Sequence, residues 1–168
     1  MTIKIESAKP ENARDILELS KVFGSETDNL SFGSAGIPIS TEKEQDYLSS
    51  VAESDKDIFL IACKDGEIIG TANYASFPKK RMSHRGEIGI SIRKSAWGMG
   101  IGNMLMKELL DFAKNTAKSD IVSLEVRSDN GKAISLYKKF GFEKIGCFKG
   151  YFKIDGVLVD FDLMEKML

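Results

Sequence analysis

The spacing of hydrophobic and polar residues divides the chain into alternating helices and strands. Apolar residues recur at helical spacing after Pro10, after Thr41 and through residues 99–117, whereas apolar and β-branched runs such as DIFLIAC indicate buried strands. Asp-Gly pairs at 65–66 and at 155–156 are typical of tight hairpin turns. The pattern predicts the element order β-α-α-β-β-β-α-β-α-β-β.

One connection in this order fixes the fold class. The expected strand 86–93, helix 99–117 and strand 121–127 form a β-α-β crossover, and such a crossover joins parallel strands. The remaining strands follow one another through hairpins or pair antiparallel. We therefore predict a mixed α/β (α+β) fold, in which helices flank a mostly antiparallel central sheet with one parallel pair. A single domain over residues 1–168 is expected.

Composition narrows the choice of partners. The 168 residues carry 24 basic and 25 acidic side chains, so the net charge of −1 gives no sign of a nucleic-acid or anionic-membrane surface. No apolar run approaches the length of a membrane span. Cys63 and Cys147 lack metal-ligand spacing, which favours a reduced, cytoplasmic setting without a bound metal.

The stretch SAWGMGIG carries the most specific chemical signal. Gly98, Gly100 and Gly102 occupy alternate positions where the predicted helix begins. Glycine allows positive φ or the close approach of a ligand, and a helix N-terminus offers amides and a dipole to an anion. A tight turn alone would need one glycine, so three favour a phosphate ligand. Asn103 stands where the Walker loop and the dinucleotide fingerprint both need glycine, so neither motif fits.

Together with the strand–helix stretch LEVRSDNGKAISLY, the glycine loop resembles the GNAT superfamily of N-acetyltransferases. The resemblance implies acetyl-CoA as co-substrate and no metal. It assigns the pyrophosphate to the loop residues, the pantetheine arm to a strand edge and to one helix cap, and it implies a bulge near Gly89 that opens a gap beside the arm. These cofactor-binding residues are Trp97, Gly98, Met99, Gly100, Ile101 and Gly102 in the loop, Ile90, Ser91 and Ile92 in the strand, and Asn130 at the cap.

The loop departs from the family pattern at one position. Trp97 stands where the family usually has Gln or Arg, so a side-chain contact to the pyrophosphate would be missing. The backbone amides remain in place, and binding should survive. We expect the indole to pack under the loop.

Two residues are candidates for the acid–base chemistry. The resemblance implies that Tyr137 is the general acid that protonates the departing thiolate, and Glu87 is the best candidate for the base that accepts the amine proton. Each has a plain structural alternative: Tyr137 lies at the edge of an apolar helix stripe, and Glu87 could be a solvated strand residue. Cys63 lies in an apolar strand and is expected to be a core thiol, not a nucleophile.

The function implied is an acetyl-CoA-dependent N-acetyltransferase that works by direct attack in a ternary complex. The alternative is a catalytically silent acyl-CoA-binding or sensor domain of the same fold. The acceptor is a small-molecule or peptide amine, and amino acids, polyamines, aminoglycosides and protein N-termini all stay open. We expect the acceptor site to be shaped by residues 30–39, the 78–85 loop and the terminal hairpin. A homodimer is one open assembly state.

Overall fold

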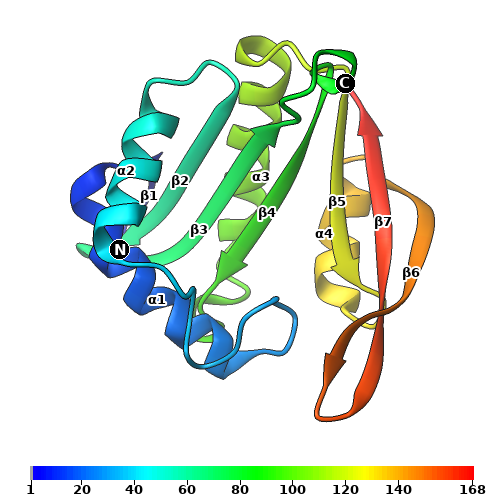
Figure 1. The fold of residues 1–168 in the computed structure, drawn as a ribbon, viewed down its shortest axis with the longest axis horizontal. Coiled ribbons are helices and arrows are strands. Elements are labelled where there is room, and N and C mark those ends of the chain that lie inside the picture. The colour runs from blue at the N-terminus through cyan, green and yellow to red at the C-terminus, as the bar shows by residue number, and fades with distance from the viewer. Residues whose placement is uncertain (1) are drawn as a thin grey trace.

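Seven strands form one continuous sheet in a computed structural model that describes residues 2–168 (Figure 1). Their spatial order is β1-β2-β3-β4-β5-β7-β6. The strands are β1 (Ile3–Ser7), β2 (Asp57–Lys64), β3 (Glu67–Ser76), β4 (Arg85–Ile92), β5 (Ile121–Arg127), β6 (Glu143–Ile154) and β7 (Val157–Met167). The helices are α1 (Ala13–Glu26), α2 (Thr41–Ala52), α3 (Ile101–Asp111) and α4 (Gly131–Lys139).

The predicted element order and fold class are confirmed. Only β4 and β5 pair in parallel, and the other neighbouring strands are antiparallel. The helix expected over 99–117 begins two residues later, because Gly100 is its left-handed N-cap, and it ends in a π-helical turn over Phe112–Thr116. None of the helices in residues 2–168 is long and apolar enough to cross a membrane.

Both Asp-Gly pairs form the predicted hairpin turns. Asp65 and Gly66 have φ of 51° and 86°, and Asp155 and Gly156 have φ of 47° and 81°. Two consecutive positive φ angles define the turn whose twist matches that of the flanking strands, and Asp-Gly adopts them at low cost.

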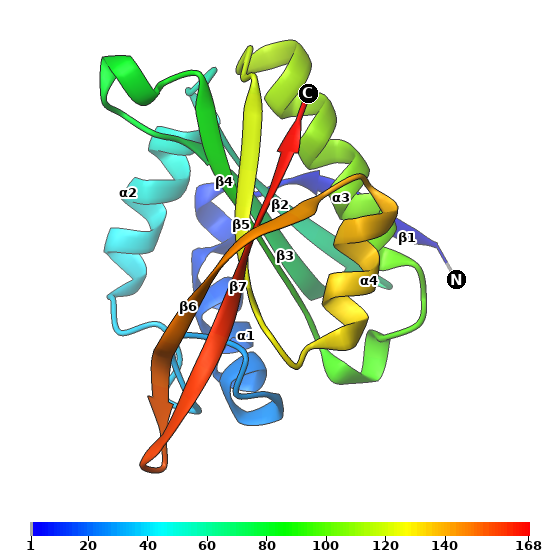
Figure 2. The same cartoon turned by 90° about the vertical axis from the view of Figure 1, so that its right-hand side faces the viewer.

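Two helical layers cover the sheet (Figure 2). Helices α1 and α2 lie on one face, where Ala13, Ile16, Leu48 and Ile61 form a small core. Helices α3 and α4 lie on the other face above a larger core, which takes in side chains of β2, β3, β4, β5 and β7. The side chains of a strand alternate between the two faces of the sheet. Membership of one core or the other therefore shows on which face each side chain of β4 and β5 lies.

β4 and β5 pair only at one end and then separate, so the sheet has a V-shaped opening (Figure 1). Residues 85–87 of β4 pair with residues 121–123 of β5, and no later pair joins the two strands. β4 remains paired to β3 through Ile92, and β5 remains paired to β7 through Arg127. The expected bulge near Gly89 is absent, because the β3–β4 register runs unbroken from Gly86 to Ile92. The gap arises because each strand follows its outer neighbour as the sheet twists.

Candidate active site

The glycine loop presents an anion-binding helix terminus at the open end of β4. Gly98 and Gly100 both have φ of +80°, and a Cβ added at either would meet no atom within 4 Å. The carbonyl of Gly100 accepts the first helical bonds, from the amides of Asn103 (3.1 Å) and Met104 (3.2 Å). The amides that precede Asn103 are thus directed out of the end of α3, where the helix dipole favours negative charge. This arrangement fits a phosphate group.

Glycine is needed at position 102 for a different structural reason than at Gly98 and Gly100. A Cβ at this position would lie 2.9 Å from Cδ2 of Leu136 on α4. Glycine here lets α3 and α4 approach closely, so the number of glycines in the loop is not in itself a measure of ligand contact. The open space beside Gly98 and Gly100 and the outward amides carry that argument.

Trp97 ties the loop to the end of β4. Its indole Nε1 donates a hydrogen bond to the carbonyl of Ile92 at 2.8 Å. The amino group of Lys132, at the start of α4, lies 5.2 Å from the centre of the indole ring, within range of a cation–π contact. The indole is 40% exposed and is held to β4 by this hydrogen bond, so it does not pack under the loop as expected, and it brings the positive charge of Lys132 to the loop. The sequence analysis missed Lys132.

The edge of β4 that faces the opening has no strand partner beyond Glu87. Ile88 is buried in the α3/α4 core, and Ile90 and Ile92 pack against that core. By alternation, Gly89 and Ser91 face the α1/α2 side. Backbone groups of residues 90–92 are thus exposed along the gap, as a strand edge that binds an extended ligand requires.

Asn130 and Tyr137 both lie on α4, beside β5. Oδ1 of Asn130 accepts a hydrogen bond from the amide of Ala133 (3.3 Å) and so caps the helix, which leaves Nδ2 as the group that would contact a ligand. Tyr137 is 9% exposed and is the one buried residue of α4, not an edge residue as the sequence suggested.

Burial raises the pKa of Tyr137 to about 12, so the phenol keeps its proton throughout the neutral range. Burial is the sole cause of this shift; no hydrogen bond or charge from the described part of the chain contributes. The ring packs edge-on against Phe142, with 6.0 Å between centroids. The result is a protonated, well-held phenol, and a group of this kind can act as a proton donor.

On the α1/α2 side of the opening, two carboxylates face each other across the gap. Glu87 lies at the last β4–β5 pair, and Glu125 lies two residues beyond that point on β5, on the same face. Burial, and then the nearby charge of Glu125, raise the pKa of Glu87. A carboxylate with a raised pKa is a better proton acceptor near neutral pH than an ordinary glutamate.

Tyr151 of β6 completes this group. Its hydroxyl donates a hydrogen bond to Oε2 of Glu125 at 2.8 Å. That bond, followed by partial burial and the charges of Glu125 and Glu87, raises the pKa of Tyr151. Three strands therefore bring Glu87, Glu125 and Tyr151 together.

The sequence analysis singled out only Glu87 of these three residues. The alternation in IVSLEVR marked Glu125 as a polar position on the face opposite the apolar one, so a signal was present for it. Nothing in the sequence places Tyr151 next to β5.

The 78–85 loop expected at the acceptor site lies elsewhere, and two aspartates of β7 are already engaged in hydrogen bonds. The 78–85 loop leads into the closed end of the V, where Arg85 pairs with Ile121, so it does not border the open end. Asp162 is buried and accepts a hydrogen bond from Ser128 at 2.6 Å, and Asp160 of β7 accepts hydrogen bonds from Lys149 and Gly150 of β6. Both carboxylates are thus already engaged within the fold.

Cys63 is only partly buried and is not the core thiol that the sequence suggested, but its surroundings also disfavour a nucleophile. Cys63 packs against the α1/α2 core, and burial together with the charge of Glu6 raises the pKa of its thiol. A raised pKa disfavours the thiolate that a nucleophile needs. Within residues 2–168, no cluster of three or more His, Cys, Asp or Glu side chains is arranged to hold a metal.

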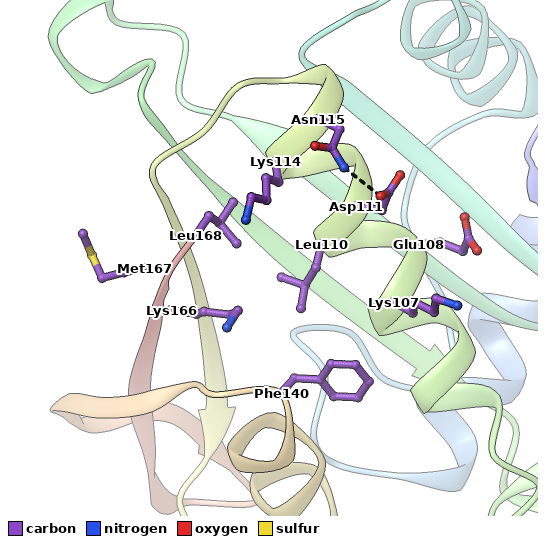
Figure 3. A pocket seen from close by; sticks show the side chains of 10 residues that line it. All are labelled: Lys107, Glu108, Leu110, Asp111, Lys114, Asn115, Phe140, Lys166, Met167 and Leu168. Carbon is purple, nitrogen blue, oxygen red and sulfur yellow. Dashed lines mark hydrogen bonds between the residues drawn. The ribbon is translucent and has the colours of Figure 1, made fainter.

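A separate surface cavity of about 430 Å³ lies along the C-terminal half of α3 (Figure 3). It is lined by Lys107, Glu108, Leu110, Asp111, Lys114, Asn115, Phe140, Lys166, Met167 and Leu168. Its lining includes lysines and acidic side chains around an apolar floor. The cavity is at the opposite end of α3 from the glycine loop, so it is not part of the cleft between β4 and β5.

Comparison with known proteins agrees with this geometry. The Acetyltransferase (GNAT) family matches residues 25–142. The L-amino acid N-acetyltransferase AaaT of Escherichia coli (strain K12) is 33% identical over 108 residues, covering 64% of this chain and 67% of that protein.

Two solved structures share the fold. A GNAT-family acetyltransferase from Streptococcus pneumoniae superposes with a TM-score of 0.96 at 30% identity, over 99% of this chain and 100% of that one. The yncA protein of Salmonella typhimurium, solved with its cofactor acetyl-CoA, has a TM-score of 0.86 over 100% of this chain and 95% of that one, and at 16% identity it shows the fold alone.

Proposed function

The chain belongs to the GNAT family of acetyltransferases, and we propose that it is an acetyl-CoA-dependent N-acetyltransferase that acylates a primary amine by direct attack in a ternary complex. One observation carries the proposal. The V between β4 and β5 has an anion-binding helix terminus at one border, a buried phenol on the α3/α4 side and a pair of carboxylates on the α1/α2 side. A thioester and an amine could meet between them without a metal.

The cofactor side is built for an elongated, anionic ligand. The amides of Gly98, Met99, Gly100, Ile101 and Gly102 would hold the pyrophosphate, and Lys132 over Trp97 would add one positive charge. The free edge of β4 at residues 90–92 and Nδ2 of Asn130 would bind the amides of the pantetheine arm. Acetyl-CoA supplies the thioester whose acyl group is transferred.

The acid–base steps follow from the two sides of the V. As the amine nitrogen forms its bond to the acyl carbon, Glu87 accepts a proton from the amine, directly or through water. As the carbon–sulfur bond breaks, Tyr137 donates its proton to the departing sulfur. The two residues return to their starting states by exchange with solvent. The raised pKa of Glu87 suits a proton acceptor, and the high pKa of Tyr137 means that the phenol holds the proton it would donate.

The acceptor remains open within the class of primary amines. AaaT, as its name states, acts on L-amino acids, which makes free amino acids the first compounds to try. Polyamines, aminoglycosides and peptide N-termini are the next compounds to test. A cytoplasmic location and a single acetyltransferase domain over residues 1–168 stay predictions.

Two measurements on the purified protein test the proposal. Calorimetry measures the binding of acetyl-CoA, and thiol release from acetyl-CoA is then followed across the panel of amines, with mass detection of the acetylated product. Saturable, amine-dependent thiol release with a matching N-acetyl product is expected. Tight acetyl-CoA binding without turnover on any amine would favour the silent acyl-CoA-binding domain, and absence of binding would overturn both.

A further inference from the structure

The pairing of β6 with β7 is irregular around Tyr151. Phe148 pairs with Phe161, and the next pair joins Phe152 to Val159. Three residues of β6 therefore stand opposite a single residue of β7, Asp160. Such a bulge changes the direction of a side chain at the price of unpaired backbone groups.

The carboxylate of Asp160 replaces the missing ladder bonds. Oδ1 accepts a hydrogen bond from the amide of Gly150 at 2.8 Å, and Oδ2 accepts one from Nζ of Lys149 at 2.8 Å. Gly150 has φ of +59°, a conformation that glycine adopts without strain. Since the lysine side chain is 82% exposed, its ion pair adds little, and the bond to the Gly150 amide is the contact that shapes the backbone.

The bulge decides where Tyr151 lies. In an unbroken ladder, Tyr151 would pair with Leu158, about 6–7 Å nearer the hairpin tip than Asp160 at ~3.3 Å per residue, and would face away from Phe148. In the structure its ring instead stacks on Phe148 with 4.9 Å between centroids and meets Phe161 edge-on at 5.3 Å. From this position the hydroxyl reaches Glu125.

We propose that Asp160 is a positioning residue of the acceptor side: by holding the Gly150 amide it sets the β6 bulge that places Tyr151 against Glu125. The inference rests on the proposed acetyltransferase function. It assigns the C-terminal hairpin a role in acceptor binding, since the Tyr151 hydroxyl holds the Glu125 carboxylate whose charge acts on Glu87.

The first test needs no substrate. The chain has four tyrosines, so labelling their ring Cζ carbons with ¹³C allows each phenol to be titrated by NMR, with Tyr151→Phe as the assignment variant. In the wild type the pKa of Tyr151 is raised by Glu125 and Glu87. In Asp160→Ala it should fall toward the ordinary tyrosine value, whereas Asp160→Asn, which keeps an oxygen for the Gly150 amide, should preserve it. Lys149→Ala is the matched control, because it removes only the ion pair. An unchanged Tyr151 titration in Asp160→Ala overturns the proposal.

The second test uses turnover on an amine from the panel. Asp160→Ala and Tyr151→Phe should each raise the KM for the amine ~5–10-fold and leave the KM for acetyl-CoA unchanged. The double variant should be no worse than the single ones, since both remove the same contact. If the effects of the two substitutions on KM multiply in the double variant, or if the KM values for the amine and for acetyl-CoA rise equally, Asp160 has only a general structural role. If no amine is acetylated, the proposed function fails, and the NMR titration still decides the positioning role by itself.

Discussion

On the α3/α4 side of the V, the groups that face the proposed ligand are mostly backbone: the amides before Asn103 and the unpaired edge of β4. On the α1/α2 side they are side chains: Glu87, Glu125 and Tyr151, from three different strands. Backbone groups fixed by a helix cap bind a constant feature of the ligand, here the phosphates and the amides of acetyl-CoA. Side chains on a sheet face can be exchanged one at a time without disturbing the fold, so this side is suited to set which amine is accepted.

The two sides of the V also differ in how far their tyrosines are exposed to solvent. Tyr137 is 9% exposed and packs in the α3/α4 core, whereas Tyr151 is 44% exposed on a hairpin whose tip, Val157 and Leu158, is open to solvent. Variants on the two sides should therefore separate into those that change cofactor binding or the chemical step and those that change acceptor binding and its pH dependence.

The largest effect is expected from Tyr137→Phe. The substitution keeps the ring that packs on Phe142 and removes only the proton donor, so turnover should fall ~10²-fold or more while acetyl-CoA affinity and melting temperature stay near native. Steady-state kinetics and calorimetry check this. Tyr74→Phe is the matched control, because it removes a buried hydroxyl that bonds Ser119 away from the opening. Normal turnover of the Tyr137 variant would leave that residue a packing residue only.

Glu87→Gln should lower kcat/KM by about 30-fold at pH 6.5 and by less at pH 9, where more of the amine is already unprotonated. The raised pKa of Glu87 means that its charge opposes folding as the pH rises above the ordinary range of a glutamate. The neutral variant should thus be at least as stable as the wild type at pH 7, and the difference should vanish near pH 4. Thermal unfolding at the two pH values checks the sign. A wild-type pH–rate profile in Glu87→Gln would pass the base role to another group.

Gly100→Ala should weaken acetyl-CoA binding ~10-fold. Gly100 and Gly66 have nearly the same positive φ and the same open surroundings, so alanine at either should cost a similar ~1–2 kcal/mol of backbone strain. Only the variant in the loop should change the dissociation constant measured by calorimetry. Equal affinities in Gly100→Ala and Gly66→Ala would remove the glycine loop from the cofactor site.

Glu125→Gln should have the smallest effect on kcat, about 2–3-fold at the optimum. Its signature is instead a shift of the acid limb of the kcat/KM profile to lower pH, because loss of the Glu125 charge removes one of the causes that raise the pKa of Glu87. Glu53→Gln, at the exposed end of α2, is the control. An acid limb that stays in place would show that the two carboxylates act independently.

Much of the fold and of the proposed cofactor side could be predicted from the sequence because the signals are local. The Asp-Gly turns at 65–66 and 155–156 require positive φ at adjacent residues, and the order of apolar periods fixed the β-α-β crossover and its parallel pair. The glycine loop predicts a helix terminus for the same reason, since Gly98 and Gly100 adopt positive φ angles that other residues avoid. Each of these features depends on a few neighbouring residues and on nothing distant.

The acceptor side was decided by tertiary structure. Glu125 and Tyr151 are 26 residues apart, and they meet because β5 and β6 flank β7 and because Asp160 redirects β6 by a bulge that no local pattern encodes. The V has the same origin: β4 and β5 carry ordinary strand sequences, and they separate after Glu87 because each stays bonded to its outer neighbour as the sheet twists. Tyr137 illustrates the limit within a single helix. Periodicity put it at the edge of the apolar stripe, but packing into the α3/α4 core and against Phe142 buried it, and burial gives the phenol its high pKa.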